Sequence, residues 1–168
     1  DITMNIEGRK SIMLSSILDQ PGNSGTIPEF AEAAIAPIEG SSEGIVFIDS
    51  NMAGFKEPII KPIVWKVKGG RVVEIDGGEE ANRLKDLLKD KDDNSCNIAE
   101  LGVGVVNKYR QFGDPDDKKF LGAGHIAIGD NRFGDGLVTS QVHLDGVFKN
   151  MTLELDGKTI MERGILKI

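Results

Sequence analysis

The apolar residues of this chain lie in short runs, which glycine and other turn-forming residues interrupt. The sequence holds 21 glycines and 6 prolines among 168 residues, and only 5% of its residues are aromatic. Runs of about four to eight residues rich in Val, Ile and Leu are typical of β-strands. We therefore expect an α+β domain that is mostly β, built as a short-stranded sheet or a partly open barrel.

Two hairpins can be predicted from their turns. Residues 63–75 place two β-rich arms around Gly69-Gly70, and residues 151–161 do the same around Asp156-Gly157. Glycine adopts the positive φ angles of a tight hairpin turn without steric cost. Further strands are expected at 1–6, 44–49, 101–106, 124–128 and 138–144.

One segment, at about 79–90, has the periodicity of a surface helix. Its first turn carries two acidic residues, which the helix dipole favours at that end. The charged, turn-rich stretches at 89–95 and 112–119 are expected to be solvated loops. The apolar positions of the helix share one face. They are Ala81, Leu84, Leu87 and Leu88.

Charge and length exclude several classes of protein. Lys and Arg number 20 and Asp and Glu 27, which gives a net charge of −7 and a pI near 4.9. Such an acidic chain is a poor match for nucleic acid or an anionic membrane surface. No apolar run approaches the ~20 residues of a membrane helix, and a single cysteine, Cys96, cannot form an internal disulfide. We expect one domain over residues 1–168, in the cytoplasm, without nucleic-acid or membrane partners.

Two histidines are the first candidates for chemistry. His143 and Asp145 lie two residues apart in a predicted strand, so their side chains project from the same face. Such a pair suits a metal site or acid–base chemistry, and equally a structural hydrogen bond. His125 lies in a glycine-rich, aliphatic segment, where a packed core residue and a ligand are equally good interpretations.

Two carboxylates extend this set. Glu100 interrupts an apolar strand pattern at 98–106, and a buried carboxylate there must be paired, protonated or bound to a metal unless the strand lies at an exposed edge. Glu32 precedes a small apolar stretch with the character of a loop or short helix, and the residues alone do not separate it from Glu29. Two histidines, one aspartate and at least two glutamates would together make a dinuclear, carboxylate-rich hydrolase site.

The loop that joins the two histidine-bearing segments supplies further candidates. Residues 129–136 are expected to bring Asn131 and Arg132 close to any site that the histidines form. The phosphate-binding glycine loop and the serine nucleophile elbow are both missing from the sequence. A metal site is therefore the best-supported chemistry.

Taken in order, these segments resemble the C-terminal, metal-binding domain of the M29 family of metallo-aminopeptidases, the thermophilic leucyl aminopeptidase group. The resemblance covers almost the whole chain and favours Glu32 over Glu29 as a ligand. The matching segments are Ile6-Glu-Gly-Arg9, Glu32-Ala-Ala-Ile-Ala-Pro37, Ile98-Ala-Glu100-Leu-Gly, Gly124-His125-Ile-Ala-Ile-Gly129 and Ser140-Gln-Val-His143-Leu-Asp145.

The resemblance implies a peptide hydrolase that removes N-terminal residues from peptide substrates. It implies a water activated between two divalent metal ions, usually zinc or cobalt, with Glu32 as the catalytic base as well as a ligand. It also suggests a homodimer. The implied metal ligands are Glu32, Glu100, His125, His143 and Asp145.

Two departures separate this chain from that family. Family members carry a tyrosine a few residues after the first histidine, whereas the single tyrosine here, Tyr109, lies elsewhere. Arg132, Asn131 or a metal would then have to stabilise the oxyanion and contact the substrate. Family members also carry a preceding domain of comparable size, which we expect this chain to lack.

Two alternative functions stay open. A related branch, resembling 2,5-dihydroxypyridine dioxygenase, uses two histidines and an aspartate, which is the composition of a facial triad for one non-haem Fe(II) ion. A metal-stabilised binding domain with weak or no catalysis is the other alternative, and the missing tyrosine favours it. The presence of both Glu32 and Glu100 favours the aminopeptidase.

Overall fold

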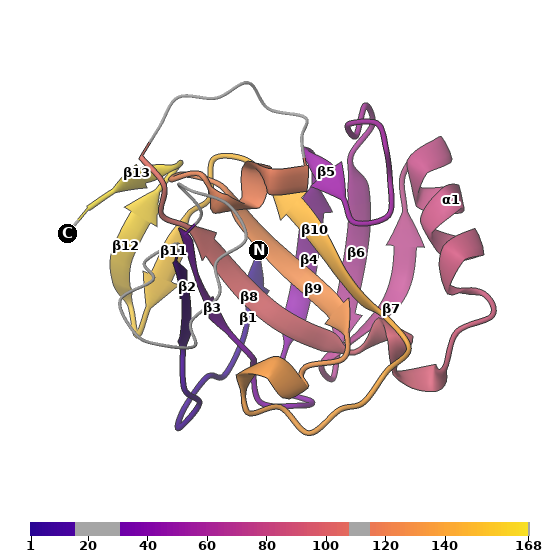
Figure 1. Ribbon diagram of the computed structural model, residues 1–168, viewed down its shortest axis with the longest axis horizontal. Coiled ribbons are helices and arrows are strands. Elements are labelled where there is room, and N and C mark those ends of the chain that lie inside the picture. Colours follow the sequence, from indigo (N-terminus) through magenta and orange to yellow (C-terminus); the bar gives the residue numbers. More distant parts are fainter. Residues whose placement is uncertain (16–30, 108–114, 168) are drawn as a thin grey trace, which may run out of the picture.

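The computed structural model describes residues 1–15, 31–107 and 115–167, which form three antiparallel sheets and one α-helix (Figure 1). The helix, α1, spans Glu79–Leu88 and lies beside β7 at one end of the molecule. The expected α+β, mostly β fold with one main helix is confirmed, and the sheets do not close into a barrel. Glu29 and Tyr109 lie outside the described residues.

The first sheet has four strands in the order β1-β4-β6-β7. The hairpin predicted at 63–75 is its β6–β7 pair. Gly69 and Gly70 connect these strands with φ angles of 56° and 71°, the positive values that a two-residue hairpin turn requires. The strands are β1 Ile2–Thr3, β4 Glu43–Ile48, β6 Ile63–Lys68 and β7 Arg71–Asp76.

The second sheet has six strands in the order β2-β3-β8-β9-β10-β5. The segment around Glu32, expected to be a loop or short helix, is strand β3 instead. The strand predicted at 138–144 begins only at His143, because the backbone N–H groups of Ser140 and Gln141 donate to the carboxylates of Asp130 and Asp92 rather than to a neighbouring strand. The strands are β2 Ile12–Ser15, β3 Ala31–Ile35, β5 Asn51–Met52, β8 Ile98–Gly104, β9 Gly124–Gly129 and β10 His143–Phe148.

A small third sheet and three 3-10 helices complete the described part of the chain. The predicted Asp156-Gly157 turn is confirmed, with φ angles of 49° and 77°. No helix in the described ranges is long and apolar enough to cross a membrane. The elements are β11 Leu153–Leu155, β12 Lys158–Glu162 and β13 Ile165–Leu166, with η1 Asp93–Cys96, η2 Pro115–Lys119 and η3 Arg132–Gly134.

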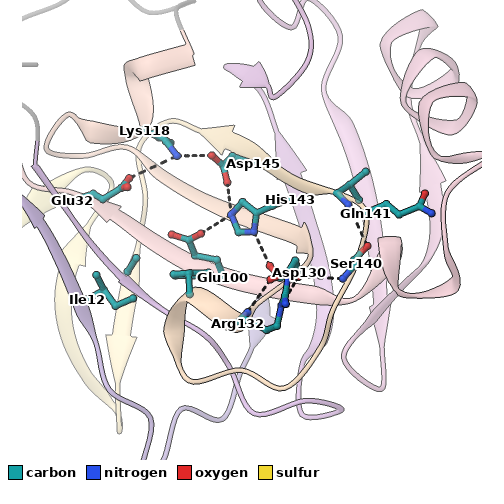
Figure 2. Close-up of a pocket in the computed structure, with 13 residues that line it drawn as sticks. Ile12, Glu32, Glu100, Lys118, Asp130, Arg132, Ser140, Gln141, His143 and Asp145 are labelled. Atoms are coloured by element: carbon teal, nitrogen blue, oxygen red, sulfur yellow. Dashed lines mark hydrogen bonds and ion pairs between the residues drawn. The ribbon is translucent and has the colours of Figure 1, made fainter. Parts of the chain in front are cut away.

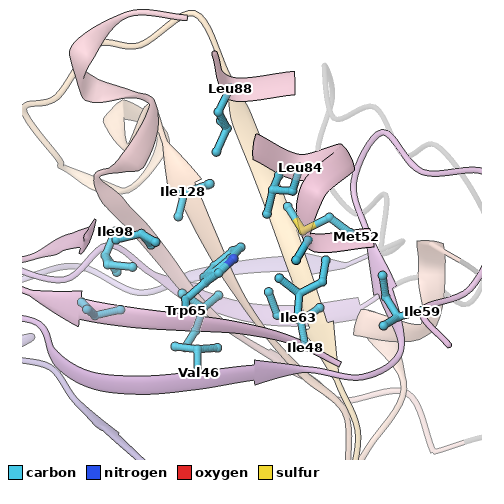
Figure 3. Close-up of a cluster of buried hydrophobic side chains, with 14 of the residues drawn as sticks. Val46, Ile48, Met52, Ile59, Ile63, Trp65, Leu84, Leu88, Ile98 and Ile128 are labelled. Atoms are coloured by element: carbon cyan, nitrogen blue, oxygen red, sulfur yellow. The ribbon is translucent and has the colours of Figure 1, made fainter. Parts of the chain in front are cut away.

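The hydrophobic core fills the space between the first sheet and one face of the second (Figure 3). Trp65 of β6 is completely buried at its centre. Ile126 and Ile128 of β9 reach it from the second sheet, and Leu84 of α1 packs in from the helix. Since side chains alternate along a strand, β9 turns its other residues, His125 among them, to the opposite face. The core therefore fixes which face of the second sheet can carry a polar site.

The helix contact gives a direct test of this core. Leu84 is fully buried, so Leu84→Ala removes its apolar contacts and should lower the free energy of unfolding by about 2–5 kcal/mol. The neighbouring exposed Lys85→Ala should change it by less than about 0.5 kcal/mol. Urea denaturation of both variants measures the difference, and equal effects would contradict the packing of α1.

Candidate metal centre

The five predicted ligands all lie on the face of the second sheet that points away from the core. Residues that pair directly across neighbouring strands share a face, so the strand register fixes their side. Their cross-strand partners are glycine or alanine, which leaves open space above the sheet. The register pairs Glu32 with Gly104, His125 with Gly102, His143 with Gly129, and both Glu100 and Asp145 with Ala127.

A β-bulge in β8 turns Glu100 toward this face. Ile98 pairs with Ile128 and belongs to the core, and simple alternation would send Glu100 into the core as well. The register shifts between these two residues, so Ala99 and Glu100 together oppose the single residue Ala127. The extra residue reverses the alternation and moves the carboxylate to the site.

Glu100 lies at the centre of the cluster (Figure 2). Its Oε1 lies 3.2 Å from Nε2 of His125, and its Oε2 lies 2.9 Å from Nε2 of His143. Nε2 of His143 is also 3.3 Å from Oδ1 of Asp145. Two sets of three groups have ligand atoms within 4.8 Å of one another, close enough to share a metal ion, namely Glu32 with Glu100 and His125, and Glu100 with His143 and Asp145. The structure thus brings all five predicted ligands together, and Glu100 belongs to both sets.

The loop after β9 orients His143. Nδ1 of His143 donates to the backbone carbonyl of Asp130 over 2.7 Å, and this bond turns Nε2 toward the carboxylates. The ring of Phe133 meets the imidazole edge-on, with 5.4 Å between ring centroids. A histidine whose second nitrogen is held by a carbonyl is the usual arrangement of a metal ligand.

Lys118 and Lys119 of η2 also reach the site, which the sequence analysis did not predict. The expectation of a solvated loop at 112–119 is wrong for its described part, because Lys119 is buried and Lys118 is mostly covered. Nζ of Lys119 binds Oε1 of Glu32, and Nζ of Lys118 binds Oδ2 of Asp145. These partners are remote in sequence, so nothing in the charged run itself marks the two lysines as buried.

The electrostatics of Glu100 and His143 favour a cation between them. Burial acts to raise the pKa of Glu100, but hydrogen bonds from His125 and His143 outweigh it and lower the pKa to about 2. Burial acts to lower the pKa of His143, but its bonds to Asp145 and Glu100 raise it to about 10. The two carboxylates therefore favour a positive charge at Nε2 of His143, and a metal ion there would take the place of the proton.

The pKa values of Asp145, Lys118 and Lys119 also depend on the balance between burial and neighbouring charges. Burial acts to raise the pKa of Asp145, yet His143 and Lys118 hold it well below its usual range. Burial acts to lower the pKa of Lys118, and the carboxylates of Asp145 and Glu32 raise it above its usual value. Burial prevails at Lys119, whose pKa is lowered despite the bond to Glu32.

A cavity of about 690 Å³ opens next to the cluster. Glu32, Glu100, His143 and Asp145 lie in its wall, whereas His125 is completely buried beneath. A small molecule in this cavity would therefore reach the side of the cluster formed by Glu100, His143 and Asp145. The rest of the wall is part apolar and part polar, with Ile12, Ala34, Phe133, Val142, Arg132 and Gln141.

The two predicted substrate-binding residues differ in placement. Arg132 lines the cavity and forms an ion pair with Asp130. Asn131 is completely buried and is not among the lining residues. Its amide nitrogen donates to Glu39 and its amide oxygen accepts from the backbone of Val138, both over 2.8 Å. Through these two bonds Asn131 holds the loop that orients His143.

The donor set fits a divalent metal ion. Oδ1 of Asp145 is buried without a hydrogen-bond partner among the described residues and faces Nε2 of His143 at 3.3 Å. Oε2 of Glu32 is also buried without such a partner and faces Nε2 of His125 at 3.8 Å. Imidazole nitrogens and carboxylate oxygens are ordinary ligands of iron, zinc and manganese. The first set would hold such an ion through Glu32, Glu100 and His125, and the second through Glu100, His143 and Asp145.

Gly102 offers a test of the space that the site requires. A Cβ atom at this position would lie 1.8 Å from Cε1 of His125, so Gly102→Ala must displace the imidazole. We expect this variant to bind divalent metal at least about tenfold more weakly, because His125 holds the carboxylate of Glu100 in place through the contact of 3.2 Å between Nε2 and Oε1. Val103→Ala is the matched control, because Val103 lies on the other face of β8 and its variant should keep the wild-type affinity. Equal metal affinities in calorimetric titrations would rule out His125 as part of the site.

The pH dependence of stability tests whether Glu39 holds the loop after β9 through its bonds with Asn131 and Leu137. Burial acts to raise the pKa of Glu39, but bonds from Leu137 and Asn131 and the charge of Arg9 lower it from 4.5 to about 2. The resulting stabilisation is present above pH 4.5 and is lost as the pH falls toward 2. Wild-type unfolding free energy should therefore fall more steeply over this range than that of Glu39→Gln. Parallel curves in urea denaturation at a series of pH values would contradict the assigned contacts.

Comparison with known proteins identifies the fold in two solved structures. The dioxygenase named for 2,5-dihydroxypyridine, from Pseudomonas putida KT2440, is 21% identical with a TM-score of 0.79, over 99% of this chain and 54% of that chain. Wild-type AmpT from Thermus thermophilus, an M29 aminopeptidase, is 19% identical with a TM-score of 0.71, over 100% of this chain and 47% of that chain. At these identities the likeness concerns the fold, and this chain spans about half the length of each. No curated protein matches the sequence.

A sequence model of a protein family gives the more specific result. The model described as "NicX: 2,5-dihydroxypyridine 5,6-dioxygenase" matches residues 1–168. This match corresponds to the dioxygenase alternative of the sequence analysis rather than to the aminopeptidase. Because the match extends over the full sequence, this chain belongs to the NicX family.

Proposed function

We propose that this chain carries the metal centre of an Fe(II)-dependent dioxygenase that opens the ring of a hydroxylated pyridine. The main support for this proposal is that His125, His143 and three carboxylates converge on one sheet face in a chain of the NicX family. Imidazole nitrogens and carboxylate oxygens are the ligand types of non-haem Fe(II) oxygenases. The aminopeptidase that the sequence analysis favoured has weaker support, because it rests on a fold likeness at 19% identity.

The ion would be held on the side of the cluster that faces the cavity. Glu100, His143 and Asp145 supply ligand atoms within 4.8 Å of one another, and all three lie in the cavity wall. A bound Fe(II) ion would supply the electrons that make O2 reactive toward an aromatic ring. Substrate could reach this ion directly from the cavity, whereas the other set includes His125, which is completely buried and does not line the cavity.

The cavity wall suits a flat, polar aromatic molecule. Phe133 is 41% exposed and lines the cavity beside His143, so its ring could contact an aromatic ligand there. Lys118 offers a cation within the same space, and its raised pKa keeps it charged at neutral pH. A ring hydroxyl that loses its proton would be held by this charge and oriented toward the centre. Val142 and Ile12 would cover the apolar edge of the ring.

A dinuclear aminopeptidase is the second candidate. One specific observation favours it, namely that the two possible ligand sets share Glu100, as a carboxylate bridging two ions would require. In that function Glu32 would be both ligand and base, and the substrate would be the N-terminal residue of a peptide.

Oxygen uptake tests the proposed function. The purified protein, loaded anaerobically with Fe(II), should consume O2 when 2,5-dihydroxypyridine is added, in proportion to the substrate supplied. His143→Ala removes a ligand and should lower the rate by about 100-fold or more. Cys96→Ser should keep the rate, because Cys96 packs against the core on the other side of the sheet. Hydrolysis of leucine anilide by the zinc- or cobalt-loaded protein, with no oxygen uptake, would contradict the proposal and support the second candidate.

A further inference from the structure

The two lysines of η2 contact a carboxylate from each of the two possible ligand sets. One ligand set contains Glu32 and the other contains Asp145. Lys118 touches both carboxylates, since its Nζ binds Oδ2 of Asp145 and lies 4.0 Å from Oε2 of Glu32 (Figure 2). Lys119 binds the other oxygen of Glu32. The negative charge of Glu32, which belongs only to the set with Glu100 and His125, is thus already balanced by the two lysines.

The position of these lysines is fixed by the fold. The side chain of Asp117 is completely buried and accepts a hydrogen bond from Ser50 over 2.9 Å. The backbone carbonyl of Lys119 accepts from the N–H of Val106, and that of Val106 accepts from the N–H of Leu121, both over 2.9 Å. These bonds anchor η2 on both sides of the lysines. Their ammonium groups are therefore held at the site rather than free to turn into solvent.

The charge balance favours a single divalent ion. Glu32, Glu100 and Asp145 carry three negative charges and the two lysines carry two positive charges, so one negative charge remains when both imidazoles are neutral. One divalent ion leaves a single positive charge, whereas two would leave three in a largely buried cluster. An excess of like charge is costly where the effective dielectric constant is low.

We propose that Lys118 and Lys119 act as a built-in second cation, which limits the centre to one divalent ion at Glu100, His143 and Asp145. Glu32 is then a partner of the lysines that holds them in place, rather than a metal ligand or a base. The inference deepens the proposed function, since a mononuclear centre is what an Fe(II) dioxygenase needs, and it rests on that function only for the identity of the metal.

Counting bound Mn²⁺ tests this inference directly. Free Mn²⁺ has a strong electron paramagnetic resonance signal that is lost on binding, so titration of the full chain gives the number of ions per chain. The wild-type chain should bind one ion at the site. Replacing both lysines, Lys118→Met with Lys119→Met, keeps most of their volume and removes both charges, and should raise the number to two. Lys66→Met, a change of the same kind on the exposed side of β6, should leave it at one.

The number of bound Mn²⁺ ions distinguishes the possible outcomes. A wild-type count other than one overturns the inference, and so does a folded double variant that still binds one ion. If the double variant does not fold, Glu32→Gln replaces it, because the inference predicts one ion in this variant and loss of the ion overturns it. The proposed function fails separately, since a count of one without oxygen uptake would reject the dioxygenase and leave the role of the lysines intact.

Discussion

Glu100 is a carboxylate placed in the middle of a six-stranded sheet, where its negative charge is stable only if cations or strong donors surround it. Both oxygens face the Nε2 atom of a histidine, and both histidines come from strands on the same side of β8 in the sheet order. Without such partners a buried carboxylate would cost several kcal/mol. The bulge at Ala99, the glycines across from the ligands and the loop that holds His143 can all be understood as support for this one group.

The two faces of the second sheet have different roles, one in packing and the other in carrying the candidate metal centre. One face packs against the first sheet and α1 and supplies stability through residues such as Trp65 and Ile128. The other carries charged groups over glycine and alanine residues, which leave open space above the backbone. Because the core fixes the strand register, it also fixes the separation of the ligands. The packed strands therefore set the spacing of the ligands, and the loop after β9 adds the orientation of the His143 ring.

Local patterns were sufficient to predict the hairpins, the helix and the pairing of His143 with Asp145, because each depends on residues close in sequence. The strand around Glu32 was missed, since alanine and glutamate have no strong preference for strands. The bulge at Ala99 and the burial of Lys118 and Lys119 depend on contacts between distant segments, which no local pattern contains. The residues alone made His125, His143, Asp145 and Glu100 candidate ligands, and the resemblance to a family of similar fold favoured Glu32 over Glu29. The dinuclear hydrolase predicted from these five residues took no account of Lys118 and Lys119, which lie beside Asp145 and Glu32 in the structure.

The proposed centre holds one divalent ion beside Glu100, with the two lysines in place of a second ion. Anomalous diffraction at the iron absorption edge, from crystals of the Fe(II)-loaded protein, tests it most directly because it locates each iron atom independently of activity. We expect one peak, within bonding distance of Glu100, His143 and Asp145. Two peaks roughly 3.5–4 Å apart, as in dinuclear sites, or a single peak bonded to Glu32, would contradict it.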